Sequence, residues 1–501
     1  MLRILGSPKR LCDGCTRRDM LWAGGLGLFG LGLPDYLRLL DVQAADGPRK
    51  HAAKSFGKAK SCILLFLYGS PSQLETFDMK PDAPVEIRGE LKPIRSSLPG
   101  LDVCELLPNA ARVMDRVTLI RSVTHPYPIH GVAFATTGVN AIDIPMELSP
   151  RDGRHWPFIG SVVDHILRGR GRKTSPIPDN VALPFPFSSR RVGEVARAGP
   201  YAAFLGGAYN PIWTEFHGEA TQHTVKTLQE QKLDVAEPYM GITPESRFEL
   251  ATATELPADV TLDRLNKRRS LVEQFDRERS KQERTTAGRS ADRYRDMAYS
   301  LIGSEKVRTA LDIGKEPGTL RESYGMTLFG QASIAARRLV EAGSRFVTVF
   351  WDEYGLAGSG WDTHWDHYPR MKNELCPGFD RGFYGLIHDL DQRGMLDDTL
   401  VVCLSEHGRT PKMQNVKGGG RDHWSQVYSV LMAGGGIARG RVVGKSDKIA
   451  GTVAERPVSP KDILATIYHL LGIDSEMTLA DRTGRPVPLV SEGKVIPEVL
   501  A

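Results

Sequence analysis

An unbroken apolar run constrains the fold of this chain more than any other feature. Residues 61–68 read Ser-Cys-Ile-Leu-Leu-Phe-Leu-Tyr and are followed at once by Gly69, Ser70 and Pro71. A strand that is apolar on both faces is typical of the centre of a parallel sheet, and the Gly-Ser-Pro sequence predicts a loop at its carboxyl end. Further strand-like runs occur at 116–124, 344–351, 398–404 and 427–432.

Helical patterns alternate with these runs. Ser459 and Pro460 have the residue types of an N-cap and a first helical position, so they predict the start of a closing helix. Strands alternating with helices predict an α/β protein with a mostly parallel central sheet. The predicted helices cover 106–113, 132–137, 330–342, 379–393 and 459–471.

The middle of the chain departs from this alternation. Residues 150–250 are rich in Pro, Gly and aromatic residues and are left unassigned, whereas 262–311 are strongly charged and helical in pattern. We therefore expect an irregular and helical insertion at about 150–330, with its charge run forming a solvated face. Recruitment of phosphate or sulfate is the alternative reading of that charge.

The N-terminus has the pattern of an export signal. Arg17 and Arg18 precede a short apolar run from Leu21 to Leu33, and Val-Gln-Ala ends at Ala44. This arrangement predicts a twin-arginine signal peptide at 1–45 and a folded domain at 46–501, located in the periplasm or outside the cell. A membrane anchor or a chance basic pair is the alternative, but the run is too short for a stable span. The formal charge of +5 is spread without a long basic run, so no nucleic-acid partner is predicted.

Histidine and carboxylate residues gather in three short clusters. Trp-Asp-Thr-His-Trp-Asp-His ends at His367, Glu406-His407 follows the apolar run 398–404, and His423 lies in a glycine-rich stretch. Imidazole and carboxylate together are the ligands of hydrolytic metal sites. Three clusters in order near strand ends predict a metal centre, and the alternative is a set of unrelated polar loop residues.

The order of these clusters resembles the metal ligands of the alkaline phosphatase/sulfatase superfamily: Asp-x4-His, an acid-His pair after a strand, then a single His. Within that superfamily the chain is similar to the bacterial exported family catalogued as domain of unknown function 1501. The stretches that carry this resemblance are Gly69-Ser-Pro-Ser-Gln-Leu-Glu-Thr-Phe-Asp78, Trp361-Asp-Thr-His364, Glu406-His-Gly-Arg-Thr-Pro411 and Gly420-Arg-Asp-His-Trp424.

The resemblance implies an alkaline phosphatase-like three-layer fold and two sets of ligands. One metal would be held by Asp362, His423 and either His367 or His364, and the second by Glu406 and His407. The superfamily places an acid directly after the first strand, where this chain has Gly69 and Ser70. Glu75 or Asp78 would then have to reach back to complete the second set, and Asp78 is our candidate.

The nucleophile differs from that of the superfamily as well. The stretch before Thr137-Gly138 lacks the formylglycine signature. Thr124 or Ser72 could attack, His130 could act as base or nucleophile, or water activated by the metal could attack directly. Arg409 has two possible roles: it could contact the oxyanion of the substrate, or it could hold the loop in place through a carbonyl or carboxylate. Candidate substrate contacts are Ser70, Ser72, His125 and Asp422.

Together these features predict an exported metal-dependent hydrolase of sulfate or phosphate esters that does not use formylglycine. The substrate would be a small molecule or a polysaccharide. Zinc suits a histidine-rich site, with calcium or manganese as alternatives. The rival hypotheses are a non-catalytic metal-binding or cell-surface binding protein with the same fold and a purely structural surface protein.

Overall fold

The structure is a computed structural model, and its description covers the chain from residue 55 onward with several gaps. The predicted signal peptide and residues 262–303 of the predicted helical insertion lie outside the described residues. The described ranges are 55–127, 130, 132–139, 149–150, 152, 154–171, 177–187, 197–228, 231–251, 304–355 and 360–501.

A nine-stranded sheet forms the centre of the described chain. Five of its eight strand pairings are parallel and three are antiparallel. From one edge to the other the order is β15 (Arg441–Val443), β4 (Val117–Val123), β14 (Tyr428–Ala433), β11 (Thr399–Leu404), β1 (Ser61–Leu67), β10 (Phe346–Trp351), β5 (Asn180–Leu183), β6 (Ile212–His217) and β9 (Arg247–Leu250). The prediction of a mostly parallel α/β sheet is therefore confirmed.

Strand β1 is the central strand of the parallel part, because it pairs with β10 on one side and β11 on the other. All seven of its residues are buried. Ile63, Leu65 and Leu67 belong to the core on one face, whereas Leu64 and Phe66 belong to the core on the other. A strand with two apolar faces needs helices on both sides, which explains why the run 61–68 is continuous rather than alternating.

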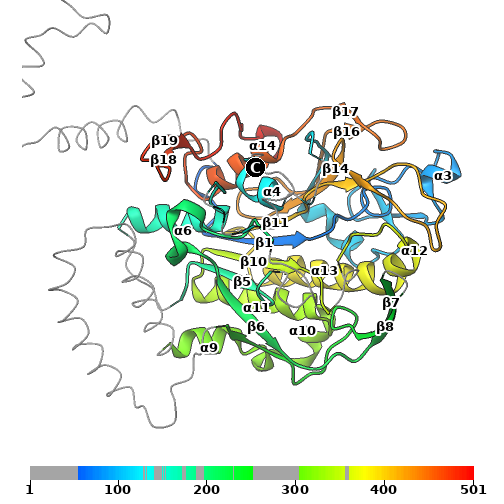
Figure 1. Ribbon diagram of the computed structural model, residues 1–501, viewed down its shortest axis with the longest axis horizontal. Helices are drawn as coiled ribbons and strands as arrows, with labels where there is room; N and C mark the ends of the chain where they lie inside the picture. Colours follow the sequence, from blue (N-terminus) through cyan, green and yellow to red (C-terminus); the bar gives the residue numbers. More distant parts are fainter. Residues whose placement is uncertain are drawn as a thin grey trace, which may run out of the picture. The chain divides into compact units, whose positions relative to one another are not determined.

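Helices cover both faces and produce three layers. Figure 1 shows α4 and α14 on one side of the strands and α11 and α13 on the other. The helices packed against the sheet are α4 (Val132–Thr137), α6 (Ile159–Gly169), α9 (Glu305–Leu311), α11 (Leu328–Ala342), α13 (Cys376–Gln392) and α14 (Pro460–Leu470). The start of α14 carries the expected cap, since Ser459 and Asp462 form a capping box.

One local prediction is wrong in detail. The helix predicted at 106–113 is the 3₁₀ helix η2 (Ala110–Arg116), because Pro108 disfavours the helical conformation at Leu107, the residue before it. The run 427–432 forms β14, which pairs antiparallel with β11. Between these two strands lies only the short hairpin β12 (Gly408–Arg409) and β13 (His423–Trp424), without a crossover helix, so the chain returns in the opposite direction.

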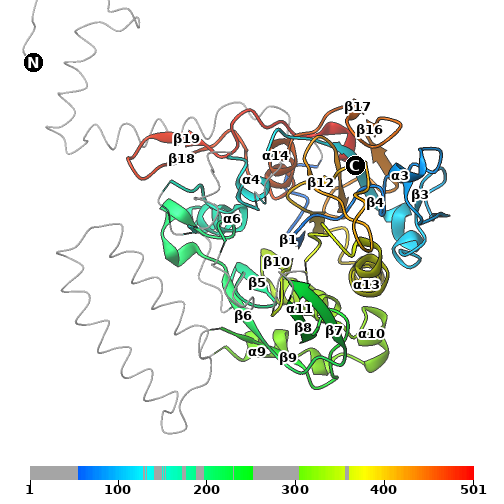
Figure 2. The ribbon, with the colours of Figure 1, turned by 45° about the vertical axis from the view of Figure 1, so that its right-hand side comes forward.

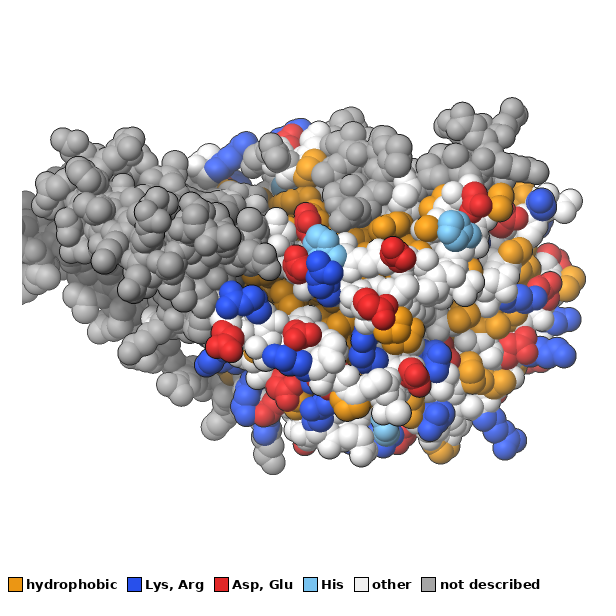
Figure 3. Space-filling model, turned by 90° about the horizontal axis from the view of Figure 1, so that it is seen from below, with side chains coloured by type: hydrophobic (Ala, Val, Ile, Leu, Met, Phe, Trp, Pro, Cys, Tyr) orange, Lys and Arg blue, Asp and Glu red, His pale blue; other side chains and the backbone are white. Residues whose placement is uncertain are grey.

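The unassigned region 150–250 supplies part of the main sheet, namely β5, β6 and β9. It also forms the hairpin β7 (His223–Leu228) and β8 (Gln231–Ala236), which lies on the side of the molecule opposite β16 (Lys445–Ser446) and β17 (Val453–Glu455) (Figure 2). On the face drawn in Figure 3, Lys and Arg side chains are interspersed with Asp and Glu. Within the described residues no helix has the length and apolarity that a membrane crossing requires.

The remaining short elements lie outside the nine-stranded sheet. They comprise helices α3 (Val85–Arg88), α10 (Gly318–Ser323) and α12 (His367–Arg370), the hairpin of β2 (Pro93–Arg95) and β3 (Asp102–Cys104), and the hairpin of β18 (Thr478–Ala480) and β19 (Pro486–Pro488).

Candidate metal centre

The three predicted clusters meet at the carboxyl ends of the central strands. Glu406 and His407 follow β11, and the loop containing Asp362 follows β10, on either side of β1. The β12–β13 hairpin then pairs Arg409 with His423 and brings that histidine to the same edge. In parallel α/β sheets this edge is where ligands bind, because loops from adjacent strands converge there.

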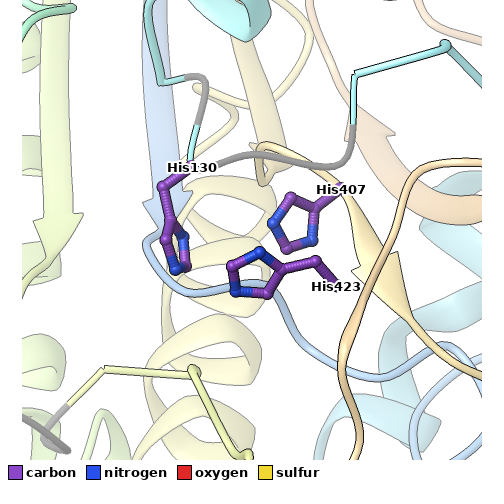
Figure 4. A group of neighbouring side chains, drawn as sticks. All are labelled: His130, His407 and His423. Carbon is purple, nitrogen blue, oxygen red and sulfur yellow. The ribbon is translucent and has the colours of Figure 1, made fainter. Parts of the chain in front are cut away.

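Three imidazoles face one another at this edge, as Figure 4 shows. The ring centroid of His130 lies 5.5 Å from that of His407 and 4.2 Å from that of His423. His407 and His423 are 4.5 Å apart by the same measure. One ring nitrogen from each residue lies within 4.8 Å of the others, a spacing compatible with a shared cation.

A second group of potential ligands shares His423. Its members are Asp362, His364 and His423, whose ligating atoms also lie within 4.8 Å of one another. Oδ1 of Asp362 is 3.0 Å from Nε2 of His364 and 3.2 Å from Nε2 of His423. The structure therefore brings His364, rather than His367, to Asp362 and His423.

His130 connects the carboxylates that follow β10 and β11. Its Nδ1 is 3.0 Å from Oε1 of Glu406, and its Nε2 is 3.2 Å from Oδ2 of Asp362. Burial disfavours the imidazolium, but the hydrogen bonds to these two carboxylates outweigh it and raise the pKa of His130 to about 9. His130 thus holds a proton at neutral pH in this arrangement.

The other two imidazoles are kept neutral. Burial, reinforced by the nearby guanidinium of Arg409, holds the pKa of His407 well below its ordinary value. Burial also lowers the pKa of His423, against the opposing effect of Asp362. Nε2 of His407 is buried and has no hydrogen-bond partner among the described residues. A neutral imidazole with an unused nitrogen is the form that binds a metal, so this donor set fits a divalent cation.

Arg409 is buried directly beneath Asp362. Its Nη2 donates to Oδ1 of Asp362 at 2.6 Å and also to the carbonyl of Gly69. Nε donates to the carbonyl of Ser70 at 3.1 Å, and Nη1 to that of Arg421 at 3.1 Å. These contacts correspond to the loop-holding role. Burial would raise the pKa of Asp362, but the charge of Arg409 and the hydrogen bonds with His130, His364 and His423 hold it well below its ordinary value.

The loop after β1 supports the centre through its backbone. The Gly69 N–H donates to Oε1 of Glu406 at 2.8 Å, and Oγ of Ser70 accepts from the His407 N–H at 3.2 Å. A Cβ on Gly69 would lie 2.4 Å from the nitrogen of Asp362. The loop directly after β1 therefore contributes backbone and hydroxyl contacts to the centre, and no carboxylate.

His367 and Glu75 belong to a buried network behind the centre. His367 Nδ1 hydrogen bonds with Oγ1 of Thr363 at 2.7 Å, and its Nε2 lies 3.3 Å from Oε2 of Glu75. Arg421 donates Nε to Oε1 of Glu75 at 3.1 Å, and its N–H donates to the carbonyl of Thr363. Burial raises the pKa of Glu75, but Arg421 and His367 reverse this effect and bring it to about 2.

The predicted substrate contacts and hydroxyl nucleophiles have different surroundings. Asp422 lies 2.8 Å from Nδ1 of His364, and His125 Nε2 lies 2.7 Å from the Glu406 carbonyl. Thr124 and His125 line a cavity of about 420 Å³, and Oγ of Ser72 is buried without a hydrogen-bond partner among the described residues.

Asp78, our candidate to complete the second metal set, is occupied elsewhere. It lies 2.8 Å from Nζ of Lys80 and 3.5 Å from Nη1 of Arg121, and it accepts a hydrogen bond from Ser446. It is not a member of either ligand group.

Sequence reasoning missed Arg421 and Tyr68. Arg421 is completely buried, whereas the sequence shows only a basic residue in a glycine-rich loop. The ring of Tyr68 packs 5.2 Å from that of His130. The available signal for Arg421 was its place next to the predicted site residues Asp422 and His423. The available signal for Tyr68 was its place at the end of the apolar run.

The three-layer fold and the convergent His/Asp cluster define an α/β protein with a candidate metal centre at the carboxyl edge of its sheet. Within that class, the chain belongs to the DUF1501 family, described as a protein of unknown function, and the family model matches residues 59–500. The resemblance to that family is thereby confirmed. No curated protein matches the chain.

Among solved structures, the chain is similar to sulfatases and phosphoesterases at low identity. The PsFucS1 sulfatase from Pseudoalteromonas sp. is 11% identical with a TM-score of 0.39, covering 91% of this chain and 76% of that one. The phosphonate monoester hydrolase of Agrobacterium radiobacter is 12% identical with a TM-score of 0.34, covering 88% and 77%. The alkaline phosphatase from the Antarctic bacterium TAB5 is 11% identical with a TM-score of 0.32, covering 76% and 92%.

Proposed function

We propose that this chain is an exported, metal-dependent hydrolase of phosphate or sulfate esters, acting on small molecules or polysaccharides. The observation that carries the proposal is the convergence of Asp362, His364 and His423 beside His130, whose Nε2 lies 3.2 Å from Oδ2 of Asp362. Ligands for a cation and a proton donor within a few ångströms are two of the elements that hydrolysis of an anionic ester requires. The third is a nucleophile, for which we propose water: its oxygen bonds to the phosphorus or sulfur as the bond to the alcohol oxygen breaks, and that alcohol oxygen takes a proton.

Asp362, His364 and His423 would hold the cation, for which zinc is the best match to two imidazoles and a carboxylate. A bound cation would neutralise charge on the tetrahedral anionic group of the ester. His423 belongs to both ligand groups, and His130, a member of the other group, is the proposed proton donor. We therefore expect one cation per chain, held by Asp362, His364 and His423.

His130 is the proposed proton donor. Asp362 and Glu406 orient its ring from opposite nitrogens, and both carboxylates favour the protonated form. A protonated imidazole at this position can give its proton to the leaving alcohol oxygen. Glu406 in turn is held by the Gly69 N–H and by Oγ of Ser405, which donates to its Oε2 at 2.8 Å.

The direct test measures metal and turnover together. The purified chain should contain about one divalent ion per molecule and hydrolyse nitrophenyl phosphate or nitrophenyl sulfate. Chelation should abolish turnover and re-addition should restore it. His423→Ala should lose both metal and activity, whereas His217→Ala, an exposed histidine on β6, should retain both. Stoichiometric metal without turnover of any ester in a broad panel would contradict hydrolysis.

A non-catalytic metal-binding protein is the second candidate. It is favoured by the loop after β1, where Gly69 and Ser70 stand in place of the superfamily's acid. Retention of metal with no turnover is the outcome that supports this candidate.

A further inference from the structure

Trp365 is an exposed aromatic residue at the candidate metal centre. It directly follows His364, and the two rings are nearly parallel, with centroids 6.4 Å apart and planes at 26°. Its side chain is 38% exposed, whereas Trp361 on the same loop is 1% exposed and packs in the core. Val416, 43% exposed, lies on the neighbouring loop. An aromatic ring that is partly exposed beside convergent polar groups is typical of ligand-binding sites.

The backbone around Trp365 is held firmly in place. Asp366 adopts a left-handed conformation with φ 48°, which residues other than glycine rarely adopt. The turn is fixed because the N–H groups of Asp366 and His367 donate to the carbonyls of Lys417 and Gly419, at 3.1 and 3.0 Å. Strained backbone of this kind persists where the surroundings determine it strongly, and it is concentrated at functional sites. The turn therefore fixes the backbone from which the indole projects.

We propose that Trp365 is a substrate-positioning residue whose indole stacks on a ring in the alcohol part of the ester. This inference rests on the proposed function, since it takes the anionic group of the same ligand to lie at Asp362, His364 and His423. The ring is either a pyranose or an aryl group, because both present a flat apolar face to an indole. An acyclic alcohol offers no such face and gains little from the contact.

The test compares ligands that differ only in the ring. Binding of phenylphosphonate and methylphosphonate forms one pair, and glucose 6-phosphate and glycerol 3-phosphate form the other. Calorimetric titration of the metal-loaded chain gives the dissociation constants. Trp365→Ala should raise the dissociation constant of one or both ring-bearing ligands about tenfold and leave those of the acyclic ligands unchanged. Trp365→Phe should recover most of the lost affinity. The matched control is Phe56→Ala, an aromatic residue that is 40% exposed and packs on His469.

The outcome also identifies the ring. A loss confined to glucose 6-phosphate assigns a pyranose, and one confined to phenylphosphonate assigns an aryl group. Equal losses for ring-bearing and acyclic ligands, no loss for either, or no binding of any of the four to the wild-type chain would each overturn the proposal. Phenylphosphonate and methylphosphonate have no ester bond, so their binding is measured without turnover. Failure of the chain to hydrolyse esters would contradict the proposed function and leave this comparison intact.

Discussion

Glu75 provides the sharpest test of the charge network behind the metal centre. Its carboxylate is completely buried between Arg421 and His367, and its pKa falls from an ordinary value of 4.5 to about 2. A carboxylate with a depressed folded-state pKa contributes stability that is fully present above pH 4.5 and is lost as the pH falls through 2. We predict that Glu75→Gln lowers the free energy of unfolding at pH 7 by about 3 kcal/mol.

The dependence of this effect on pH distinguishes it from lost packing. At pH 3.5 the unfolded Glu75 is mostly protonated while the folded one is still charged, so about 1 kcal/mol of its contribution has been lost. The difference between wild type and Glu75→Gln should therefore be about 1 kcal/mol smaller at pH 3.5 than at pH 7. Urea unfolding at both pH values measures it.

The matched control for this experiment is Glu90→Gln. Glu90 is exposed and pairs with Lys372 on the surface, so its replacement should cost less than about 1 kcal/mol at either pH. If the difference between wild type and Glu75→Gln is the same at pH 7 and pH 3.5, the reasoning about the buried ion pair is refuted.

Three further predictions concern the ligand set and the nucleophile. His423→Ala should bind no stoichiometric metal by elemental analysis, since it removes a member of both groups. His367→Asn should retain the metal, but its free energy of unfolding should be about 1–3 kcal/mol lower, because the substitution removes a partner of buried Glu75. Loss of metal in this variant would show that His367 is a ligand. Thr124→Val and Ser72→Ala should keep kcat within about threefold of wild type, whereas a drop of about a hundredfold or more in one variant would assign the nucleophile to it.

The parts of the fold that could be predicted are those that depend on short stretches of neighbouring residues. The continuous apolar run of β1 identified a central strand, and the residue types Ser459 and Pro460 identified the start of α14. The direction of β14 was not predictable from its own residues, because an apolar run has the same appearance in parallel and antiparallel sheets. It depended on the short connection from β11.

The candidate site was predictable to the level of its clusters, and the division of roles within them was not. Asp362 precedes His364 by two residues and His367 by five, and either spacing is compatible with ligation. What separates the two histidines is long-range contact: Nε2 of His364 lies 3.1 Å from that of His423, while His367 turns inward to Glu75. These partners are distant in sequence, so spacing alone could not choose between them.

The position of Gly69 limits which substitutions this chain can accept next to Asp362. Any side chain at that position would meet the backbone of Asp362, with even a Cβ at 2.4 Å, so Gly69→Asp could not be accommodated without displacing the loop that carries Asp362. No single substitution at Gly69 can therefore add a carboxylate directly after β1 in this chain. A laboratory selection for that arrangement would have to rebuild the loop at 360–364 at the same time.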